Sequence, residues 1–413
     1  MKPNTGRILT THSGSLPRPE ALIALNRARA QGEQVDDEAL KEHLSSGVAN
    51  VVKQQADIGI DVPDDGELGK PTTQAVDYGA WWSYAYRRLG GFQPASEVPE
   101  VEPRPSKLSN VVLTSFPGRR DRKRFSEAYS DPSSNIPGGG PPPPGQGSRP
   151  RTGIGMVCTG PIEYTGLDLL NADVANLKAA LQGVSVTDAF MCAVTPGSFC
   201  RGEDAYYKTE EEFIHAAAEA LRVEYKAIVD AGFILQLDDP AMADNWDMVD
   251  PEPSVADYQK FAMIRVEALN QALRDLPEDR IRYHVCWGSW HGPHTTDVPL
   301  KDIIDVVLKV NAGEYSVEAG NVRHEHEWKV WKDAKLPDGK VVVPGVVSHS
   351  TNLVEHPELV ADRIIDYANV VGRENVIAST DCGLGGRVHP QIAWAKLEAL
   401  AEGARLASKQ LWP

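Results

Sequence analysis

The chain has 413 residues, of which 41% are hydrophobic and 24% are charged, a composition typical of a globular protein with a large core. Its formal net charge of −16 argues against nucleic acid and anionic membrane surfaces as partners. The net charge says little about small substrates, because the charge around one site can differ from the total.

The amino-terminal stretch has no long apolar segment, and no apolar run is long enough to cross a bilayer. We therefore expect neither a signal peptide nor a membrane anchor. The cysteines are too few, and odd in number, for a disulfide framework: they are Cys158, Cys192, Cys200, Cys286 and Cys382. A reducing, cytoplasmic location is expected, where a special cysteine serves as a metal ligand or a nucleophile.

Short β-rich runs alternate with long helical stretches along the chain. The predicted strands are 8–11, 60–64, 189–195, 233–238, 282–287, 315–319, 341–347 and 376–380. The predicted helices include 210–231, 255–276, 300–311, 357–371 and 391–408. This alternation favours an α/β fold built as a single (β/α)₈ TIM-like barrel over residues 1–413. The rival is a doubly wound open sheet, but the GxGxxG that often follows its first strand is missing.

Residues 117–155 interrupt the alternation. They contain RRDRKR and then PSSNIPGGGPPPPGQGSRP, where four consecutive prolines among glycines favour a loop over a helix or a strand. We interpret this Pro/Gly-rich insertion as a surface segment that adds no core, with a lid over the active site as the alternative. The runs 107–114 and 155–163 around it are predicted to form an extra hairpin packed on the barrel.

The motif RYHVCWG carries the strongest chemical signal. Residues two apart on a strand project to the same face, so His284 and Cys286 should project together. Glu318 ends the next predicted strand, and Cys382 follows the last one. In an α/β barrel the carboxyl ends of the strands carry the active site, and one imidazole, one carboxylate and two thiols suit tetrahedral Zn²⁺.

Other histidines compete for this role. His324 and His326 are rival ligands, but they begin a charged segment where a solvated role is favoured. His291 and His294 lie in the loop after the His-x-Cys motif and are second-choice candidates. A buried cysteine often acts only as a small hydrophobic residue, so the argument depends on the joint placement of four residues at strand ends.

These motifs resemble the catalytic domain of cobalamin-independent methionine synthase and its relatives, which include epoxyalkane:coenzyme M transferases. The resemblance runs from THSGSLPRP to DCGLGGR, excluding the insertion. It implies a (β/α)₈ barrel whose zinc ligands are His284, Cys286, Glu318 and Cys382. The chain lacks the length for the second barrel of the synthase, which puts folate binding in doubt.

The resemblance also implies roles for individual residues. Ser15, in the Gly-Ser pair after the first strand, would meet an amino-acid substrate. Glu67 and Asp238, at the ends of the second and fourth strands, would bind its amine. His349, in GVVSHSTN, would act as the catalytic proton donor.

The implied function is zinc-dependent methyl transfer to a small thiol such as homocysteine from an alkyl donor that the sequence does not name. Epoxide opening by coenzyme M or another thiol is an alternative, as are a non-catalytic barrel that binds a thiol or a corrinoid protein and a zinc-free decarboxylase. The sulfonate of coenzyme M would need arginines, for which the candidates are Arg18, Arg201, Arg323 and Arg387. The sequence does not fix the oligomeric state, and a homo-oligomer is one candidate.

Overall fold

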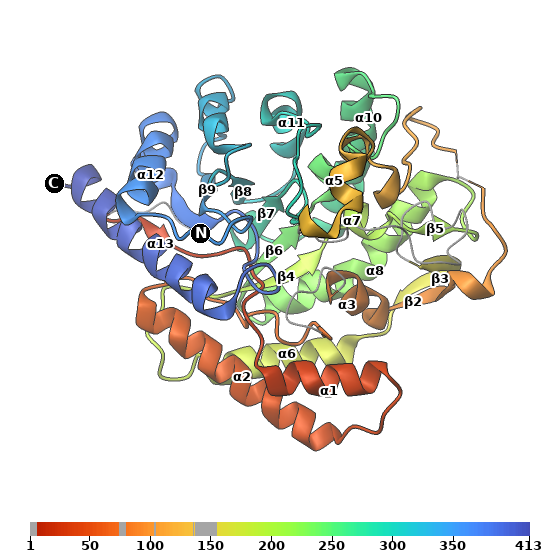
Figure 1. Cartoon of the computed structure of the whole chain (residues 1–413), viewed down its shortest axis with the longest axis horizontal. Helices are drawn as coiled ribbons and strands as arrows, with labels where there is room; N and C mark the ends of the chain where they lie inside the picture. The colour runs from red at the N-terminus through yellow and green to blue at the C-terminus, as the bar shows by residue number, and fades with distance from the viewer. Residues whose placement is uncertain (1–5, 74–79, 103–104, 135, 137–154) are drawn as a thin grey trace.

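A parallel, curled β-sheet forms the centre of the computed structural model (Figure 1). The residues described are 6–73, 80–102, 105–134, 136 and 155–413. Within them the sheet has seven strands in the order β1-β10-β9-β8-β7-β6-β4, and every neighbouring pair is parallel. The strands are β1 (Leu9–Thr10), β4 (Phe190–Val194), β6 (Ile234–Asp238), β7 (Ile281–Val285), β8 (Glu314–Glu318), β9 (Val341–Val347) and β10 (Ile377–Thr380).

The prediction of a strand at 60–64 is wrong, although this segment lies where that strand was expected. The backbone amides of Asp61 and Val62 both donate to the carbonyl of Thr10 in β1, and the carbonyl of Pro63 accepts from Phe190 in β4. The segment therefore bridges the two ends of the sheet, as a closing strand would. It is irregular because the Asp61 carboxylate accepts the amide of Thr10 and Pro63 has no amide to donate.

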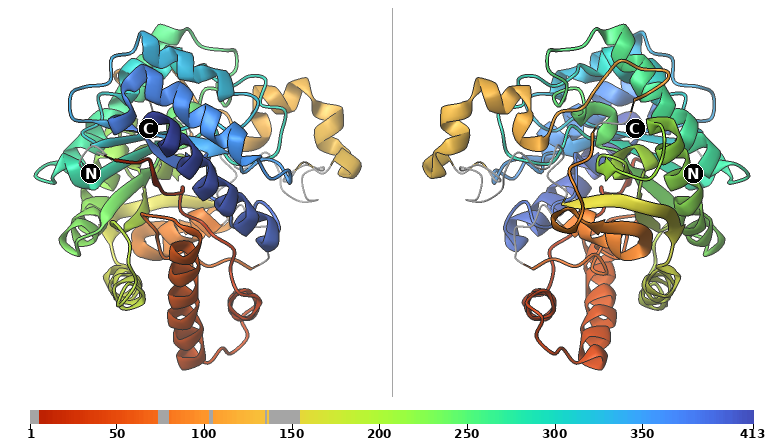
Figure 2. Two further views of the ribbon diagram at one scale, coloured as in Figure 1. Left: turned by 90° about the vertical axis from the view of Figure 1, so that its left-hand side faces the viewer. Right: turned by 90° about the vertical axis from the view of Figure 1, so that its right-hand side faces the viewer.

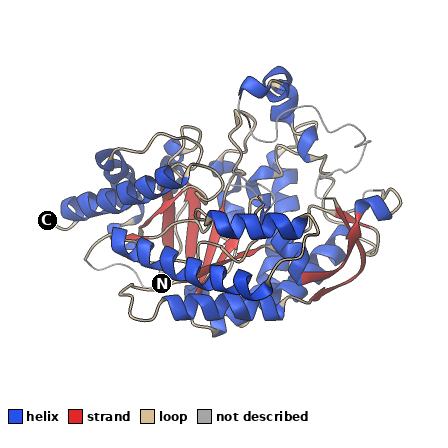
Figure 3. Cartoon of the chain, turned by 60° about the horizontal axis from the view of Figure 1, so that its bottom comes forward, coloured by secondary structure: helices blue, strands red, loops and turns tan. Residues whose placement is uncertain are grey.

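Helices surround the sheet, as the red strands enclosed by blue helices show in Figure 3. Those that alternate with the strands are α2 (Asp37–Ile58), α6 (Leu167–Ala180), α8 (Glu210–Asp230), α10 (Val255–Leu273), α11 (Leu300–Val307), α12 (Pro357–Val371) and α13 (Pro390–Leu411). Side chains at their starts satisfy exposed amides: Thr209 caps α8 and Ser254 caps α10. Among the described helices, none is both long and apolar enough to cross a membrane.

The strands β6, β7 and β8 are buried at every position, as expected for a parallel sheet covered on both faces. The interior also holds a charged pair, in which Nε of Arg282 donates to Oε2 of Glu314 over 2.7 Å and both side chains are at most 1% exposed. The curled parallel sheet and the segment that bridges its two ends are consistent with a TIM-like barrel. In such a barrel the carboxyl ends of all strands lie at the same mouth.

An antiparallel pair lies beside the barrel, but it is not the predicted hairpin. β3 (Met156–Tyr164) pairs with β2 (Leu89–Pro94), and a short β5 (Glu203–Asp204) extends the sheet (Figure 1). The run 107–114 forms no strand. The carboxylate of Glu211 accepts the backbone amides of Lys107 and Leu108, so these donors are not available to a ladder.

The first part of the predicted insertion contains short helices, α4 (Arg120–Arg124) and α5 (Ser126–Ser130). They project from the body of the molecule in both views of Figure 2. The sequence RRDRKRFSEAYS holds helix-forming residues, whereas the glycines and most of the prolines come later. Residues 135 and 137–154 lie outside the described residues, so the view that the Pro/Gly-rich part adds no core remains a prediction.

Candidate active site

A group of one imidazole and two thiols lies at the mouth of the barrel, with His284 and Cys286 buried and Cys382 half-buried. His284 is on β7, Cys286 follows the end of that strand, and Cys382 follows β10. Their ligand atoms all lie within 4.8 Å of one another. The structure therefore brings together three of the four predicted metal ligands, which come from strands that are far apart in the sequence.

The surroundings of His284 fit a metal site. Its Nδ1 lies 3.1 Å from the hydroxyl oxygen of Ser316, the residue beside it on β8. Its Nε2 is buried and makes no hydrogen bond of regular geometry with any described residue. An Nδ1–H donated to Ser316 leaves the lone pair on Nε2 for a metal, which is the usual support for a ligating histidine.

The two thiols differ in their electrostatics. A hydrogen bond from Cys286, helped by the nearby His284 and opposed by burial, lowers the pKa of Cys382 well below its usual value. The same hydrogen bond, together with burial, raises the pKa of Cys286 well above its usual value. Thiolate is the form that binds Zn²⁺, so the surroundings of Cys382 favour the protonation state that a metal needs.

Glu318 ends β8 next to this group but is not part of it. Its Oε1 accepts the amide of Trp287 over 2.9 Å and its Oε2 accepts the side-chain amide of Asn321 over 2.6 Å. Burial, with a contribution from the charge of Asp381, raises the pKa of Glu318 to about 8. The role of Glu318 as fourth ligand remains a prediction; each of its oxygens accepts one hydrogen bond and keeps a further lone pair.

His349 follows β9 and is only 2% exposed. Neither of its ring nitrogens has a hydrogen-bond partner among the described residues. Burial lowers the pKa of His349 to about 3, so the ring is neutral near pH 7. His291 lies beside it, with Nε2 3.3 Å from the His349 carbonyl oxygen. An unpartnered buried imidazole next to the thiols is suited to contact a reacting group.

The rival histidines are engaged elsewhere. His324 was expected to be solvated, but it is buried and bridges two carboxylates, Asp297 at 3.1 Å and Glu327 at 2.8 Å. Although burial opposes its charge, these hydrogen bonds raise the pKa of His324 to about 10. His294 also pairs with Asp297, and His326 is exposed. None of them belongs to the three-residue metal group within the described part of the chain.

A second buried cluster joins Glu67, Asp238 and Cys192, whose ligand atoms also lie within 4.8 Å of one another. Asp238 ends β6 and is the register neighbour of His284 on β7, so the two clusters are adjacent. Burial raises the pKa of Asp238 to about 6, although nearby His284 and Lys70 oppose the shift. The sequence prediction missed Cys192, which the alternation of β4 could have placed inside the barrel with Phe190.

Ser15 contacts Arg18 and the loop after β10. Its hydroxyl accepts from Arg18 over 3.0 Å, and its backbone packs against Gly383 in the loop after β10. The neighbouring Gly14 is the residue of this pair that touches the cluster, since a Cβ placed there would lie 2.7 Å from Oε1 of Glu67.

A tight turn presents Glu67, whose backbone has a φ of +56°. Non-glycine residues rarely adopt this conformation, and it persists only when the surroundings impose it. The Asp65 carboxylate accepts the Glu67 amide over 2.8 Å, and the Asp64 carboxylate accepts the Gly66 amide over 2.7 Å. Arg18 donates to the carbonyl of Glu67 over 2.9 Å. These contacts hold a strained turn at the mouth, as is common at functional sites.

The close approach of Gly14 gives a testable consequence. Its φ is +103°, and an added Cβ would lie 2.6 Å from the sulfur of Cys192 and 2.7 Å from Glu67. Gly14→Ala should therefore displace Glu67 and weaken the binding of an amine-bearing thiol by about tenfold or more, measured by calorimetric titration. Gly232→Ala is the matched control, because Gly232 has a φ of +94° and nothing within 4 Å of the added carbon. Equal affinities in the two variants would contradict this assignment.

The loop after the His-x-Cys motif is clamped by the first part of the insertion. The Trp290 ring lies between the guanidinium of Arg119, 4.1 Å from the ring centroid, and the imidazole of His294, at 3.9 Å between centroids. Its indole N–H donates to the hydroxyl of Tyr129 over 3.0 Å. Arg119 also forms a buried two-pronged ion pair with Asp244. The insertion thus begins as part of the mouth, not as a detached surface loop.

Comparison with known proteins agrees with this geometry. Over 407 residues the chain is 24% identical to a methionine synthase of Sulfolobus acidocaldarius, covering 97% of this chain and 93% of the relative. It is also 24% identical over 410 residues to a methionine synthase of Sulfurisphaera tokodaii, covering 97% and 93%. Both alignments span nearly the full length of each protein.

Among solved structures, the fold is similar to that of a B12-independent methionine synthase from Shewanella sp. W3-18-1 in complex with selenomethionine. The TM-score is 0.65 at 18% sequence identity, over 98% of this chain and 99% of the other. The family model described as "Cobalamin-independent synthase, Catalytic domain" matches residues 171–405, more than half of the sequence. The chain therefore belongs to the catalytic-domain family of the cobalamin-independent methionine synthases.

Proposed function

We propose that this protein is a zinc-dependent methyltransferase that methylates the sulfur of a thiol amino acid such as homocysteine. The observation that carries the proposal is the adjacency of two clusters of ligand-type side chains on neighbouring strands. One offers His284, Cys286 and Cys382 to a soft metal, and the other offers the carboxylates of Glu67 and Asp238. Membership of the methionine synthase family supports the same reaction class.

The donor set fits zinc, with Glu318 as the nearest candidate for a fourth ligand. Bound there, zinc would deprotonate a substrate thiol and keep its sulfur nucleophilic at neutral pH. The two thiolates and the imidazole would hold the ion at the mouth, and the burial of His284 and Cys286 would limit the access of bulk water to the sulfur.

The other residues bind and orient the substrate. Glu67 and Asp238 would accept charge-assisted hydrogen bonds from the ammonium of the amino acid. His349 would act as the proton donor to the group that leaves the methyl carbon; its ring is neutral in the empty site, so it would take up a proton before donating it, and neither nitrogen is engaged by a described residue. Cys192 would pack against the carboxylates and limit the size of the acceptor.

The contacts of the arginines give less support to coenzyme M as the acceptor. Arg201 is buried and donates to Asp244 over 2.7 Å, while Arg18 donates to backbone carbonyls and Ser15. Arg387 donates to Ser289, and Arg323 lies on the exposed loop after β8. The carboxylates of the second cluster would repel a sulfonate.

A thiol screen tests the proposal. Zinc-loaded protein is mixed with homocysteine, coenzyme M or glutathione, and proton release is followed in weakly buffered solution, because metal binding expels the thiol proton. We expect zinc-dependent release of about one proton per chain with homocysteine. Release with coenzyme M alone would favour epoxide opening, and release with none of the three would contradict an alkyltransferase of this type.

A further inference from the structure

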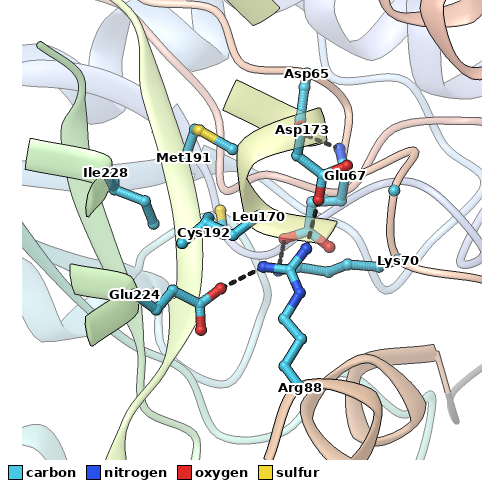
Figure 4. Close-up of a pocket in the computed structure, with 11 residues that line it drawn as sticks. Asp65, Glu67, Lys70, Arg88, Leu170, Asp173, Met191, Cys192, Glu224 and Ile228 are labelled. Atoms are coloured by element: carbon cyan, nitrogen blue, oxygen red, sulfur yellow. Dashed lines mark hydrogen bonds and ion pairs between the residues drawn. The ribbon is translucent and has the colours of Figure 1, made fainter. Parts of the chain in front are cut away.

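A lysine ammonium lies behind the predicted amine-binding carboxylate. Glu67 and Lys70 close one turn, in which the amide of Lys70 donates to the carbonyl of Glu67 over 3.0 Å. The same turn brings Nζ of Lys70 to 3.0 Å from Oε1 of Glu67, and the two side chains are 7% and 9% exposed. Figure 4 shows both residues lining a small buried cavity with Cys192.

The ammonium is fixed in place. It lies 4.6 Å from the centroid of the Tyr84 ring, and the Tyr84 hydroxyl in turn accepts the amide of Val194 in β4. Burial opposes the charge of Lys70, but the carboxylates of Glu67 and Asp238 outweigh burial and raise the pKa of Lys70. Lys70 therefore stays a cation at the edge of the acceptor cluster.

The second cation that lines this cavity, Arg88, forms its ion pairs with other carboxylates. Arg88 pairs with Asp173 and Glu224, which also line the cavity (Figure 4). The imidazole of His12 is buried and burial lowers its pKa to about 4, so it is neutral near pH 7. Among the described residues, Lys70 is thus the one charged partner with an ion pair to Glu67.

We propose that Lys70 is a positioning residue for acceptor selection, whose ammonium holds Glu67 as an oriented carboxylate for the ammonium group of a thiol amino acid. This inference rests on the proposed function. Two buried carboxylates, Glu67 and Asp238, repel each other without a cation between or beside them. Lys70 offsets that repulsion and occupies one oxygen of Glu67. The two carboxylates and the ammonium of Lys70 then carry a net charge of about −1, which suits a ligand with one ammonium group.

The test compares two thiols by calorimetric titration of zinc-loaded protein: homocysteine and 4-mercaptobutanoate, which lacks only the amine. In Lys70→Met the dissociation constant for homocysteine should rise about tenfold or more, while that for 4-mercaptobutanoate stays nearly unchanged. Lys70→Arg should restore most of the preference. Lys53→Met removes an exposed lysine on α2 and is the control.

A double-mutant cycle separates positioning from a general structural role. If Lys70 acts through Glu67, then Lys70→Met should cost no further homocysteine affinity in a Glu67→Gln background. That background also removes the uncompensated buried charge, so the double variant remains measurable if Lys70→Met folds poorly.

Three results would overturn the proposal: an equal loss for both thiols, tighter binding of homocysteine by Lys70→Met, or an undiminished effect of Lys70→Met in Glu67→Gln. Failure of the proposed function is distinct, since then neither thiol would bind the wild-type protein in a zinc-dependent manner.

Discussion

Cys286→Ser and Cys382→Ser should each lower zinc affinity by about a hundredfold or more and abolish methyl transfer. The two sulfurs and His284 form one group within 4.8 Å, so each thiolate supplies a large share of the charge that holds the ion. Serine keeps the size of the side chain but is a poor ligand for a soft metal near pH 7. Elemental analysis after dialysis against a weak chelator measures the effect.

The matched control is Cys158→Ser. Cys158 is buried but lies on β3, outside the barrel mouth, with its sulfur against the carbonyl of Gly160. Its replacement should leave zinc content unchanged. If both site variants retain a full equivalent of zinc, the assignment of these cysteines as zinc ligands fails.

His349→Asn should lower turnover by about 10²–10⁴-fold while zinc content and thiol affinity stay close to those of the wild type. The ring is buried, and neither nitrogen has a hydrogen-bond partner among the described residues, so its loss removes no side-chain hydrogen bond to them. Asparagine fills part of the space but has no titratable nitrogen. Single-turnover measurement with a preloaded thiol isolates the methyl-transfer step.

His326→Asn serves as the control, because His326 is exposed on the segment after β8 and should not affect turnover. Loss of zinc from His349→Asn would make the residue a ligand or the support of one. Turnover at the wild-type rate would mean that another group or a water molecule supplies the proton.

The periodic part of the fold could be predicted from the sequence. Seven of the eight predicted barrel strands match observed strands within one or two residues, because buried parallel strands are continuous apolar runs bounded by polar ends. The strand at 60–64 failed because an aspartate and a proline changed its hydrogen bonds without changing its apolar pattern. The partner of β3 was also misassigned, since pairing between distant segments leaves little local signal.

The sequence predicts those residues of the candidate site that lie at the carboxyl ends of barrel strands. His284, Cys286 and Cys382 meet because each occupies the carboxyl end of a barrel strand. The sequence did not indicate Cys192 or Lys70, whose importance depends on which side chains the fold places beside them. The sequence also predicted that His324 is exposed to solvent. Its hydrogen-bond partner Asp297 comes from another loop, so the local sequence gives no sign of this contact.

The turn that carries Glu67 also bears on the thermodynamics of recognition. Its backbone is strained yet held by the carboxylates of Asp64 and Asp65 and by the guanidinium of Arg18 before any ligand arrives. Ligand binding therefore need not order this part of the mouth, and little conformational entropy should be lost there. The acceptor thiol should meet a preorganised surface, and the turn should superpose closely in the free and bound proteins.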